Sequence, residues 1–355
     1  MEYIFEDVLE IKNGKNQKAV ENSEGLYPIY GSGGVMGYAD DYICDADTVI
    51  IGRKGNINNP IYVNERFWNV DTAFGLSAKR ELLLPRYLFY FCKKFDFEKL
   101  NKTVTIPSLT KSDLLKIKID LPVISEQQDV VDRLSKIEAV IELRKQKLSA
   151  LDDLIKARFV EMFGIPLLND KGWNVISATE CCSIITDGSH FSPQGQKDGY
   201  PMLSVKDMRN DGFHYEKCKK ISEKDFQILK KQGCIPKVGD VLISKDGSYF
   251  YYGFVLREYK EQAILSSIAM LRPVLNRVNP YYLCNYMLSE GVVSFVGDNY
   301  VTGAALKRVI LKGIKQIPVM LPPIELQNQF ADFVQQVDKS KFEELKVFNL
   351  KQKIR

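Results

Sequence analysis

Apolar residues recur every three or four positions along the stretch from Leu121 to Met162. This spacing is typical of a heptad seam, in which one long helix packs along another. Pro122 and Ser125 mark the predicted start of the helix, and Gly164 and Pro166 mark its end. At about 1.5 Å per residue, about 38 helical residues make a rod of about 57 Å, so the helix needs a partner. The predicted seam residues are Val130, Leu134, Ile137, Ile141, Leu148, Leu151 and Ile155.

A second, shorter copy of this pattern begins at Leu321 and carries seam residues Val334 and Val337. Three matches upstream extend the repeat: Asp47–Gly55 with Asp240–Gly247, Pro85–Leu88 with Pro280–Leu283, and Ile11–Gly14 with Ile185–Gly188. The period is much longer than the roughly 20 to 50 residues of a solenoid, so the chain contains a duplicated domain.

The rest of each copy is rich in short strands separated by Gly- and Asn-rich turns, which predicts an α+β fold. In the first copy, Thr48–Ile51 and Phe67–Leu76 are predicted strands and Pro85–Phe97 a predicted helix. The predicted organisation is a first globular domain over residues 1–122, a long helix over 123–163, a linker over 164–172, a second globular domain over 173–322 and a distal helix over 323–355. The distal helix is shorter and its seam is poorer, so we expect either a native short helix or a truncated gene product.

Composition narrows the functional classes only slightly. The chain has 355 residues, a formal net charge of +4 and an ordinary apolar content, which neither demands nor excludes nucleic acid. No transmembrane run or signal-peptide layout is found, so we expect a soluble, cytoplasmic protein. Seven cysteines form no CxxC pair; buried thiols are favoured over a zinc site made from Cys181, Cys218, Cys234 and His214, and no metal is expected.

Catalytic motifs are weak. Gly31–Gly34 is favoured as a simple glycine-rich loop over a dinucleotide site, and no phosphate loop of the GxxxxGK[ST] type occurs. Asn59–Tyr62, with the sequence NPIY, is close to the (N/D)PP(Y/F) motif of adenine methyltransferases, but its third residue is Ile instead of Pro. A turn containing proline is favoured there. We therefore expect no catalytic residues, and a divergent N6-adenine DNA methyltransferase remains the enzyme alternative.

Loops at strand ends carry residues suited to phosphates and base edges. Arg53–Lys54 follows a strand in a glycine turn, and Lys245–Asp246 occupies the matching place in the second copy. A lone basic turn is usually solvated surface, but recurrence at matching places favours DNA contact. The candidate DNA-contact residues are Tyr30, Ser32, Arg53, Lys54, Asn56, Ser189, His190, Lys206, Arg209, Lys245, Asp246 and Tyr249.

The whole chain resembles the specificity subunit of a type I restriction-modification system. The resemblance rests on the repeat together with Leu121–Gln128, Leu321–Gln327 and the helix-closing Ala157–Phe163. It implies two target-recognition domains, each reading one half of a bipartite double-stranded DNA target, and two long helices that pair as an antiparallel coiled coil and set the spacer.

The resemblance also implies partners. Methylation subunits, expected as two copies, would dock on the helices, and restriction subunits would join them. S-adenosylmethionine, ATP and Mg would be bound by those subunits, so no cofactor and no catalytic activity are expected on this chain, and no membrane is involved. Base-reading residues differ between family members, so none is carried over by motif. A coiled-coil scaffold whose globular domains bind something other than DNA is the third alternative.

Overall fold

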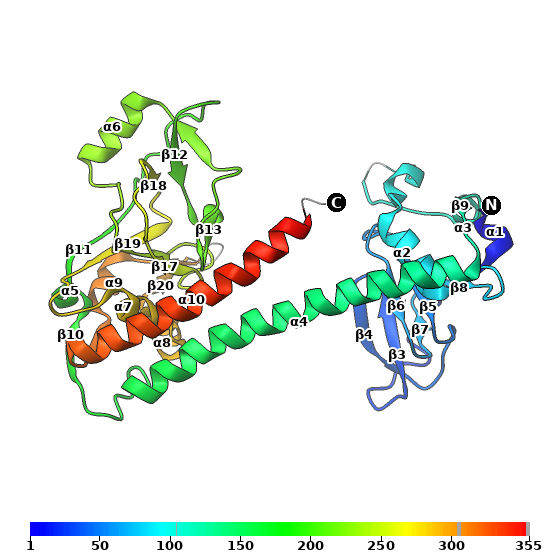
Figure 1. The fold of residues 1–355 in the computed structure, drawn as a ribbon, viewed down its shortest axis with the longest axis horizontal. Helices are drawn as coiled ribbons and strands as arrows, with labels where there is room; N and C mark the ends of the chain where they lie inside the picture. Colours follow the sequence, from blue (N-terminus) through cyan, green and yellow to red (C-terminus); the bar gives the residue numbers. More distant parts are fainter. Residues whose placement is uncertain (104, 304–306, 353–355) are drawn as a thin grey trace. The chain divides into compact units, whose positions relative to one another are not determined.

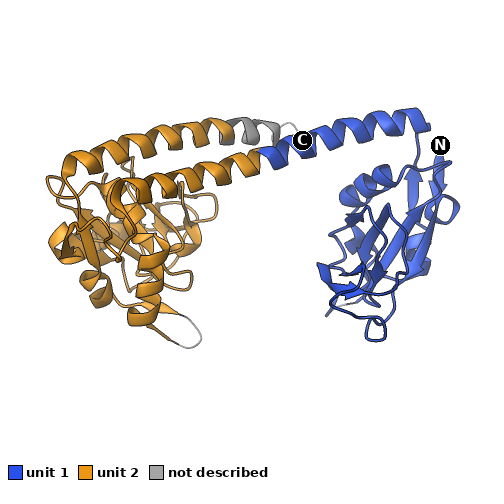
Figure 2. Cartoon of the chain, turned by 90° about the horizontal axis from the view of Figure 1, so that it is seen from below, with its two compact units in different colours: residues 1–143 blue, residues 144–355 orange. Residues whose placement is uncertain are grey.

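The computed structural model describes residues 1–103, 105–303 and 307–352. The chain divides into two compact units, unit 1 (Met1–Leu143) and unit 2 (Arg144–Arg355), shown in Figure 2. The long helix α4 (Ile124–Phe163) contributes residues to both units, and helix α10 (Ile324–Gln352) belongs to unit 2. The last three residues of the predicted distal helix lie outside the described residues. In the part of the chain that the structure describes, no helix combines the length and apolarity needed to cross a membrane.

Unit 1 is built on an antiparallel sheet with strand order β2-β8-β5-β6. Its strands are β2 (Leu9–Asn13), β8 (Ala73–Ala78), β5 (Thr48–Gly52) and β6 (Ile61–Val63). A smaller sheet has the order β4-β3-β7, from β4 (Gly34–Ala39), β3 (Tyr27–Gly31) and β7 (Trp68–Asn69), and β1 (Glu2–Ile4) pairs with β9 (Lys118–Asp120). The helices are α1 (Phe5–Val8), α2 (Pro85–Lys94), a 3-10 turn (Phe97–Leu100) and α3 (Lys111–Leu115).

The central strand β5 is buried along its whole length, as its unbroken apolar sequence requires, and the predicted strand there is confirmed. The prediction of a single strand over Phe67–Leu76 is wrong. That stretch contains β7 and the start of β8, which belong to different sheets and are separated by a turn with Asp71 exposed. The predicted helix Pro85–Phe97 ends at Lys94, because the backbone of Phe95 is extended.

Unit 2 repeats the strand order of unit 1, which establishes the duplication. Its main sheet has the order β11-β19-β16-β17, from β11 (Cys182–Asp187), β19 (Ile268–Pro273), β16 (Val241–Ser244) and β17 (Gly253–Val255). Its smaller sheet has the order β15-β12-β18, from β15 (Lys219–Ile221), β12 (Tyr200–Leu203) and β18 (Ala263–Ile264), and β10 (Asn174–Ser177) pairs with β22 (Pro318–Leu321). The counterparts of α1, α2 and α3 are α5 (Ala178–Cys181), α7 (Pro280–Met287) and α9 (Leu311–Gln316).

Unit 2 also has elements without a counterpart in unit 1. These are a 3-10 turn (Val205–Asp207), the pair β13 (Met208–Arg209) and β14 (Gly212–Phe213), α6 (Glu223–Lys231), α8 (Glu290–Tyr300), and the pair β20 (Val301–Thr302) and β21 (Arg308–Val309).

Within unit 2, α10 packs antiparallel along the C-terminal half of α4 (Figures 1 and 2). The direction follows from two ion pairs, Lys341 with Asp152 and Glu344 with Lys147, in which rising positions on α10 meet falling positions on α4. Phe159 stacks edge-on against Phe330, with ring centroids 5.3 Å apart. The predicted seam residues Ile155, Val334 and Val337 lie in this buried core, and Leu151 packs against it. Leu148 is half-buried.

The N-terminal part of α4, in unit 1, departs from the predicted seam. Val130 and Ile137 are 38% and 41% exposed, so the predicted seam does not hold at these positions, and Leu134 and Ile141 are half-buried. Unit 1 buries Val131 instead of Val130. On this part of the helix, the carboxylate of Glu138 accepts a hydrogen bond from the hydroxyl of Tyr90 on α2 at 2.8 Å.

Each long helix is fastened to its own unit by one buried glutamine. In unit 1, Nε2 of Gln127 donates to the carbonyl of Leu82 at 2.8 Å and to that of Pro122 at 3.0 Å, and its Oε1 accepts from the N–H of Leu84 at 2.9 Å. Leu84 is the residue that precedes the first turn of α2. These three hydrogen bonds, the glutamine clamp, tie the start of α4 to the start of α2.

The clamp recurs in unit 2 with the same geometry. Gln327 donates to Arg277 at 3.1 Å and to Pro322 at 2.8 Å, and accepts from the N–H of Asn279 at 2.9 Å. Asn279 precedes the first turn of α7. Both glutamine side chains are completely buried. The glutamine of the repeated Leu-Pro motif therefore satisfies backbone groups that would otherwise be buried without partners.

Replacing Gln327 by Leu should destabilise unit 2 by about 2 kcal/mol, because it leaves a buried N–H and two carbonyls without partners. The matched control is Gln128→Leu, since Gln128 is exposed and bonds only to Asp132 in its own helix at 2.7 Å. Denaturant unfolding of both variants measures the difference. Equal stabilities for the two variants would contradict the structural role of the clamp.

Candidate nucleic-acid interface

The loop that follows the central strand is held by the same backbone hydrogen bonds in both units. In unit 1, the N–H of Arg53 donates to Thr72 at 2.8 Å, the N–H of Leu109 donates to Arg53 at 2.9 Å, and the N–H of Gly55 donates to Pro107 at 2.9 Å. These contacts, the loop frame, join the end of β5 to the start of β8 and to the segment that precedes α3.

The equivalent bonds in unit 2 have nearly the same lengths. The N–H of Lys245 donates to Ser267 at 2.8 Å, the N–H of Val309 donates to Lys245 at 3.1 Å, and the N–H of Gly247 donates to Lys307 at 2.8 Å. A second pair of loops joins the frame, because the N–H of Lys15 donates to Asn69 and the N–H of Ser189 donates to Ile264, both at 2.8 Å. The candidate residues of the two units therefore occupy matching places.

Glycines allow the chain segments of the frame to approach one another. A Cβ at Gly52 would lie 2.1 Å from the carbonyl oxygen of Asn56 and 3.0 Å from the Cβ of Ser32. A Cβ at Gly188 would lie 2.1 Å from the carbonyl oxygen of Ile264. Contacts of that length are not sterically possible, so these positions require glycine if the loops are to keep their conformation.

In unit 1, the frame presents polar side chains to solvent. Arg53, Lys54 and Asn56 are exposed, and Ser32 is half-buried in the β3–β4 turn beside Gly52. The Arg53 guanidinium lies 5.8 Å from the centre of the Phe74 ring. Tyr30 is half-buried and packs edge-on against Phe67 at 5.4 Å; burial raises the pKa of its hydroxyl. Four of the five candidates of unit 1 therefore gather at one end of the main sheet, and Tyr30 supports them from the adjoining strand.

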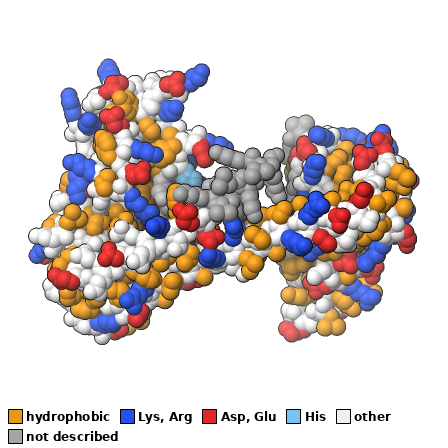
Figure 3. Space-filling view, in the orientation of Figure 1, with side chains coloured by type: hydrophobic (Ala, Val, Ile, Leu, Met, Phe, Trp, Pro, Cys, Tyr) orange, Lys and Arg blue, Asp and Glu red, His pale blue; other side chains and the backbone are white. Residues whose placement is uncertain are grey.

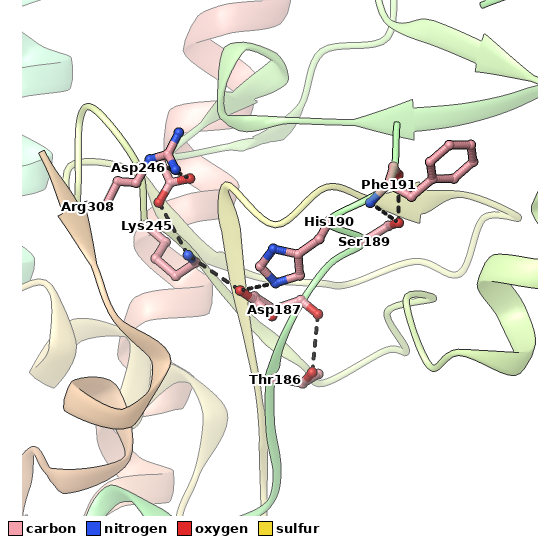
Figure 4. Close-up of polar contacts among 8 residues, drawn as sticks. All are labelled: Thr186, Asp187, Ser189, His190, Phe191, Lys245, Asp246 and Arg308. Carbon is pink, nitrogen blue, oxygen red and sulfur yellow. Dashed lines mark hydrogen bonds and ion pairs between the residues drawn. The ribbon is translucent and has the colours of Figure 1, made fainter. Parts of the chain in front are cut away.

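In unit 2, the same positions form a chain of alternating charges (Figure 4). Nζ of Lys245 lies 3.4 Å from Asp187 and 3.3 Å from Asp246. Nε2 of His190 lies 3.3 Å from Asp187, and Nε of Arg308 lies 3.8 Å from Asp246. The Lys245 side chain is only 9% exposed, whereas those of His190 and Arg308 are 77% and 60% exposed.

These contacts correct the expectation for Lys245 as an exposed basic residue like Arg53. Lys245 is buried between two carboxylates, so it is not placed to contact a phosphate directly. Ser189 is also buried, and its hydroxyl donates to the carbonyl of Phe191 at 2.6 Å. Asp246 is half-buried with its carboxylate in the charge chain. Of the predicted group around this loop, only His190 is well exposed.

The remaining candidates of unit 2 lie on two other segments. Lys206 and Arg209 are exposed on the connection after β12, where the Arg209 guanidinium lies 5.6 Å from the centre of the Tyr252 ring. This connection reaches the frame through the N–H of Val205, which donates to Oγ of Ser267 at 3.1 Å. Tyr249 is half-buried against the unit 2 core, and its hydroxyl faces α8, since a Cβ on Gly297 would lie 3.1 Å from it. Tyr249 is therefore directed away from the exposed loops.

Sequence reasoning missed Asp187 and Arg308. Asp187 ends β11 and pairs with Ala269, as Asn13 ends β2 and pairs with Phe74. Arg308 forms a β-bridge with Asp246, as Ser108 does with Lys54. The match of Ile11–Gly14 with Ile185–Gly188 contained the signal for Asp187, because it aligns Asn13 with Asp187. No match extended to the segment that contains Arg308.

The motif Asn59–Tyr62 has a structural explanation. The Tyr62 hydroxyl donates to Asp47 at 2.6 Å, and the Arg86 guanidinium lies 4.1 Å from the centre of its ring. Burial and the hydrogen bond to Asp47 raise the pKa of Tyr62 to about 12, and the same bond lowers the pKa of Asp47. Tyr62 is engaged in strand packing, so it is not presented to a base.

Charge and thiols give no sign of other chemistry. Lys and Arg side chains alternate with Asp and Glu over the face shown in Figure 3, in keeping with the small net charge. Cys181, Cys218 and Cys234 belong to three different side-chain clusters, so these members of the hypothetical zinc set do not converge.

Comparison with known proteins gives a consistent family. The model of the type I restriction modification DNA specificity domain matches residues 2–153 and 170–354. The specificity subunit of the type I restriction enzyme EcoBI from Escherichia coli is 22% identical over 82% of this chain and 66% of its own length. That of EcoDI, also from Escherichia coli, is 18% identical over 93% of this chain and 79% of its own length.

Among solved structures, the crystal structure of a type I restriction-modification S subunit from M. genitalium aligns with a TM-score of 0.62 at 15% identity. The alignment covers 100% of this chain and 93% of that one. At this identity the likeness shows the fold.

Gly52→Ala should displace the loop that carries Arg53 and lower the stability of unit 1 by about 1–3 kcal/mol, because the new methyl group overlaps the Asn56 carbonyl. The control is Gly33→Ala in the neighbouring turn, where a Cβ meets nothing within 4 Å. Amide hydrogen exchange of the loop reports the displacement. Unchanged exchange at Gly55 and Leu109 in the Gly52 variant would show that the frame does not depend on this close approach.

Proposed function

Because the chain belongs to the family of type I restriction-modification DNA specificity proteins, we propose that it is the subunit that selects the DNA sequence for such a complex. Each unit binds one half of a bipartite double-stranded target. The loops of the two frames, Arg53–Asn56 in unit 1 and the loops around Arg308 in unit 2, contact phosphates and base edges.

The observation that carries this proposal is one backbone frame with two different sets of exposed side chains. Unit 1 presents Arg53, Lys54 and Asn56, and unit 2 presents His190 and Arg308 at matching places. Phosphate contacts position a protein on DNA, and side chains at base edges determine the sequence that is bound. A repeated frame with different side chains is the arrangement expected of two domains that bind two different half-sites.

The long helices supply the surface for partner subunits in this proposal. Methylation subunits, in two copies, dock on α4 and α10, and restriction subunits join the assembly. S-adenosylmethionine, ATP and Mg bind to those subunits, while this chain recognises DNA without catalysing a reaction. The antiparallel packing of α10 on α4 within unit 2 and the glutamine clamp at the start of each helix support a rigid helical element.

The methyltransferase alternative loses its main support, because the Tyr of its motif is engaged with Asp47 and Arg86. The scaffold alternative leaves the matching exposed residues of the two frames without a role. DNA binding by the assembled complex distinguishes the three functions.

Arg53→Ala and Lys54→Ala, tested separately in the complex with its methylation subunit, should each weaken DNA binding. A side chain that neutralises one phosphate should also lower the slope of log affinity against log salt by about 1. Affinities are measured by fluorescence anisotropy at several salt concentrations. The control is Arg80→Ala, at the opposite end of β8, where the exposed Arg80 pairs with Asp47 at 2.7 Å. Affinity and slope equal to those of the control would contradict the assignment.

A further inference from the structure

The two frames differ in the residue that lies beneath the loop. In unit 1, the position that pairs with Ile51 is Phe74, whose ring is buried beneath the Arg53 guanidinium, and Arg53 remains exposed. In unit 2, Ala269 pairs with Ile243 at the equivalent position. The smaller side chain leaves room under the loop, and the side chain of Lys245 is buried there.

Charge completes the difference. The strand-end residue is Asn13 in unit 1 and Asp187 in unit 2. A buried ammonium is stable only when it is paired and hydrogen-bonded, and Asp187 and Asp246 provide two carboxylates within 3.4 Å of Nζ. Two carboxylates against one ammonium leave an excess of one negative charge, which attracts a cation at each outer end of the chain of charges.

The two outer ends are the exposed side chains of His190 and Arg308 (Figure 4). Each contacts the carboxylate that also contacts Lys245. The backbone of Arg308 is fixed as well, because its neighbours Lys307 and Val309 bond to Gly247 and Lys245 in the loop frame. A side chain oriented in advance loses less conformational entropy on binding than a free one.

We propose that Arg308 and His190 are DNA-contact residues of unit 2 and that Lys245 is their positioning residue. Lys245 orients the two carboxylates, and the carboxylates in turn hold Arg308 and His190 toward the half-site. The inference rests on the proposed function of the chain and assigns specific roles within it. Arg308 presents a planar guanidinium, which can bond two acceptors of guanine or of a phosphate at once.

The test uses the complex of the full chain with its methylation subunit and a duplex that carries the motif identified by methylation sequencing. Arg308→Ala should weaken binding about 10-fold and relax discrimination in one half-site only. Lys245→Met should have a similar effect. The double variant should be about 10-fold weaker in total and not about 100-fold, because Arg308 depends on Lys245 for its position.

Arg277→Ala is the matched control, since Arg277 is an exposed arginine of unit 2 that lies near Cys181, at the opposite end of β11. It should leave affinity and discrimination unchanged. Arg308→Ala and His190→Ala alter exposed side chains, so they keep the test informative even if Lys245→Met does not fold.

Three results would overturn the inference. Unchanged discrimination in Arg308→Ala and His190→Ala would remove their DNA-contact role while leaving the proposed function intact. Additive losses in the Lys245 and Arg308 double variant would remove the positioning role. Failure of the unaltered complex to distinguish its motif from a scrambled duplex would overturn the proposed function and this inference with it.

Discussion

The buried glutamine at the start of each long helix is the contact on which the arrangement of both units depends. Gln127 and Gln327 are fully buried, and each satisfies three backbone groups in the segment that leads into the next helix of its unit. An amide side chain is suited to this role, because it donates and accepts at the same time. The direction in which each helix leaves its own unit is therefore fixed by hydrogen bonds as well as by apolar packing.

The same economy of structure appears at the loops. One set of backbone bonds is used twice, and exposed chemistry is changed by substitutions beneath and beside it. Phe74 and Asn13 in unit 1 leave Arg53 at the surface, whereas Ala269 and Asp187 in unit 2 bury Lys245 and make Arg308 the exposed base. Because the frame is separate from the residues it displays, recognition can change without a change of fold.

Much of this organisation is predictable from the sequence, because it depends on local patterns. The repeated Leu-Pro motif with its glutamine, the match of Asp47–Gly55 with Asp240–Gly247, and the apolar run of β5 correctly predict a duplicated α+β domain with long helices. The seam prediction is accurate where α4 packs against α10, but Val130 and Ile137 are exposed. Heptad spacing indicates which residues share a helix face, and it does not indicate how far the partner helix extends.

The errors at the candidate interface have a different cause. Lys245 resembles Arg53 in sequence, but its burial depends on Asp187 and Ala269, which lie on other strands and are distant along the chain. Tyr249 belongs to an aromatic run whose members face different directions. Arg308 lies in a segment with no sequence match to unit 1. Burial and pairing of this kind are determined by tertiary contacts, which neither propensity nor motif spacing reports.

The most direct test of two half-site readers is sequencing of N6-methyladenine in cells that express this chain with its methylation subunit. The account predicts methylation at a split motif, two short half-sites separated by a gap of fixed length, that disappears when this chain is deleted. Methylation at a single contiguous motif, or methylation that persists without this chain, would contradict it.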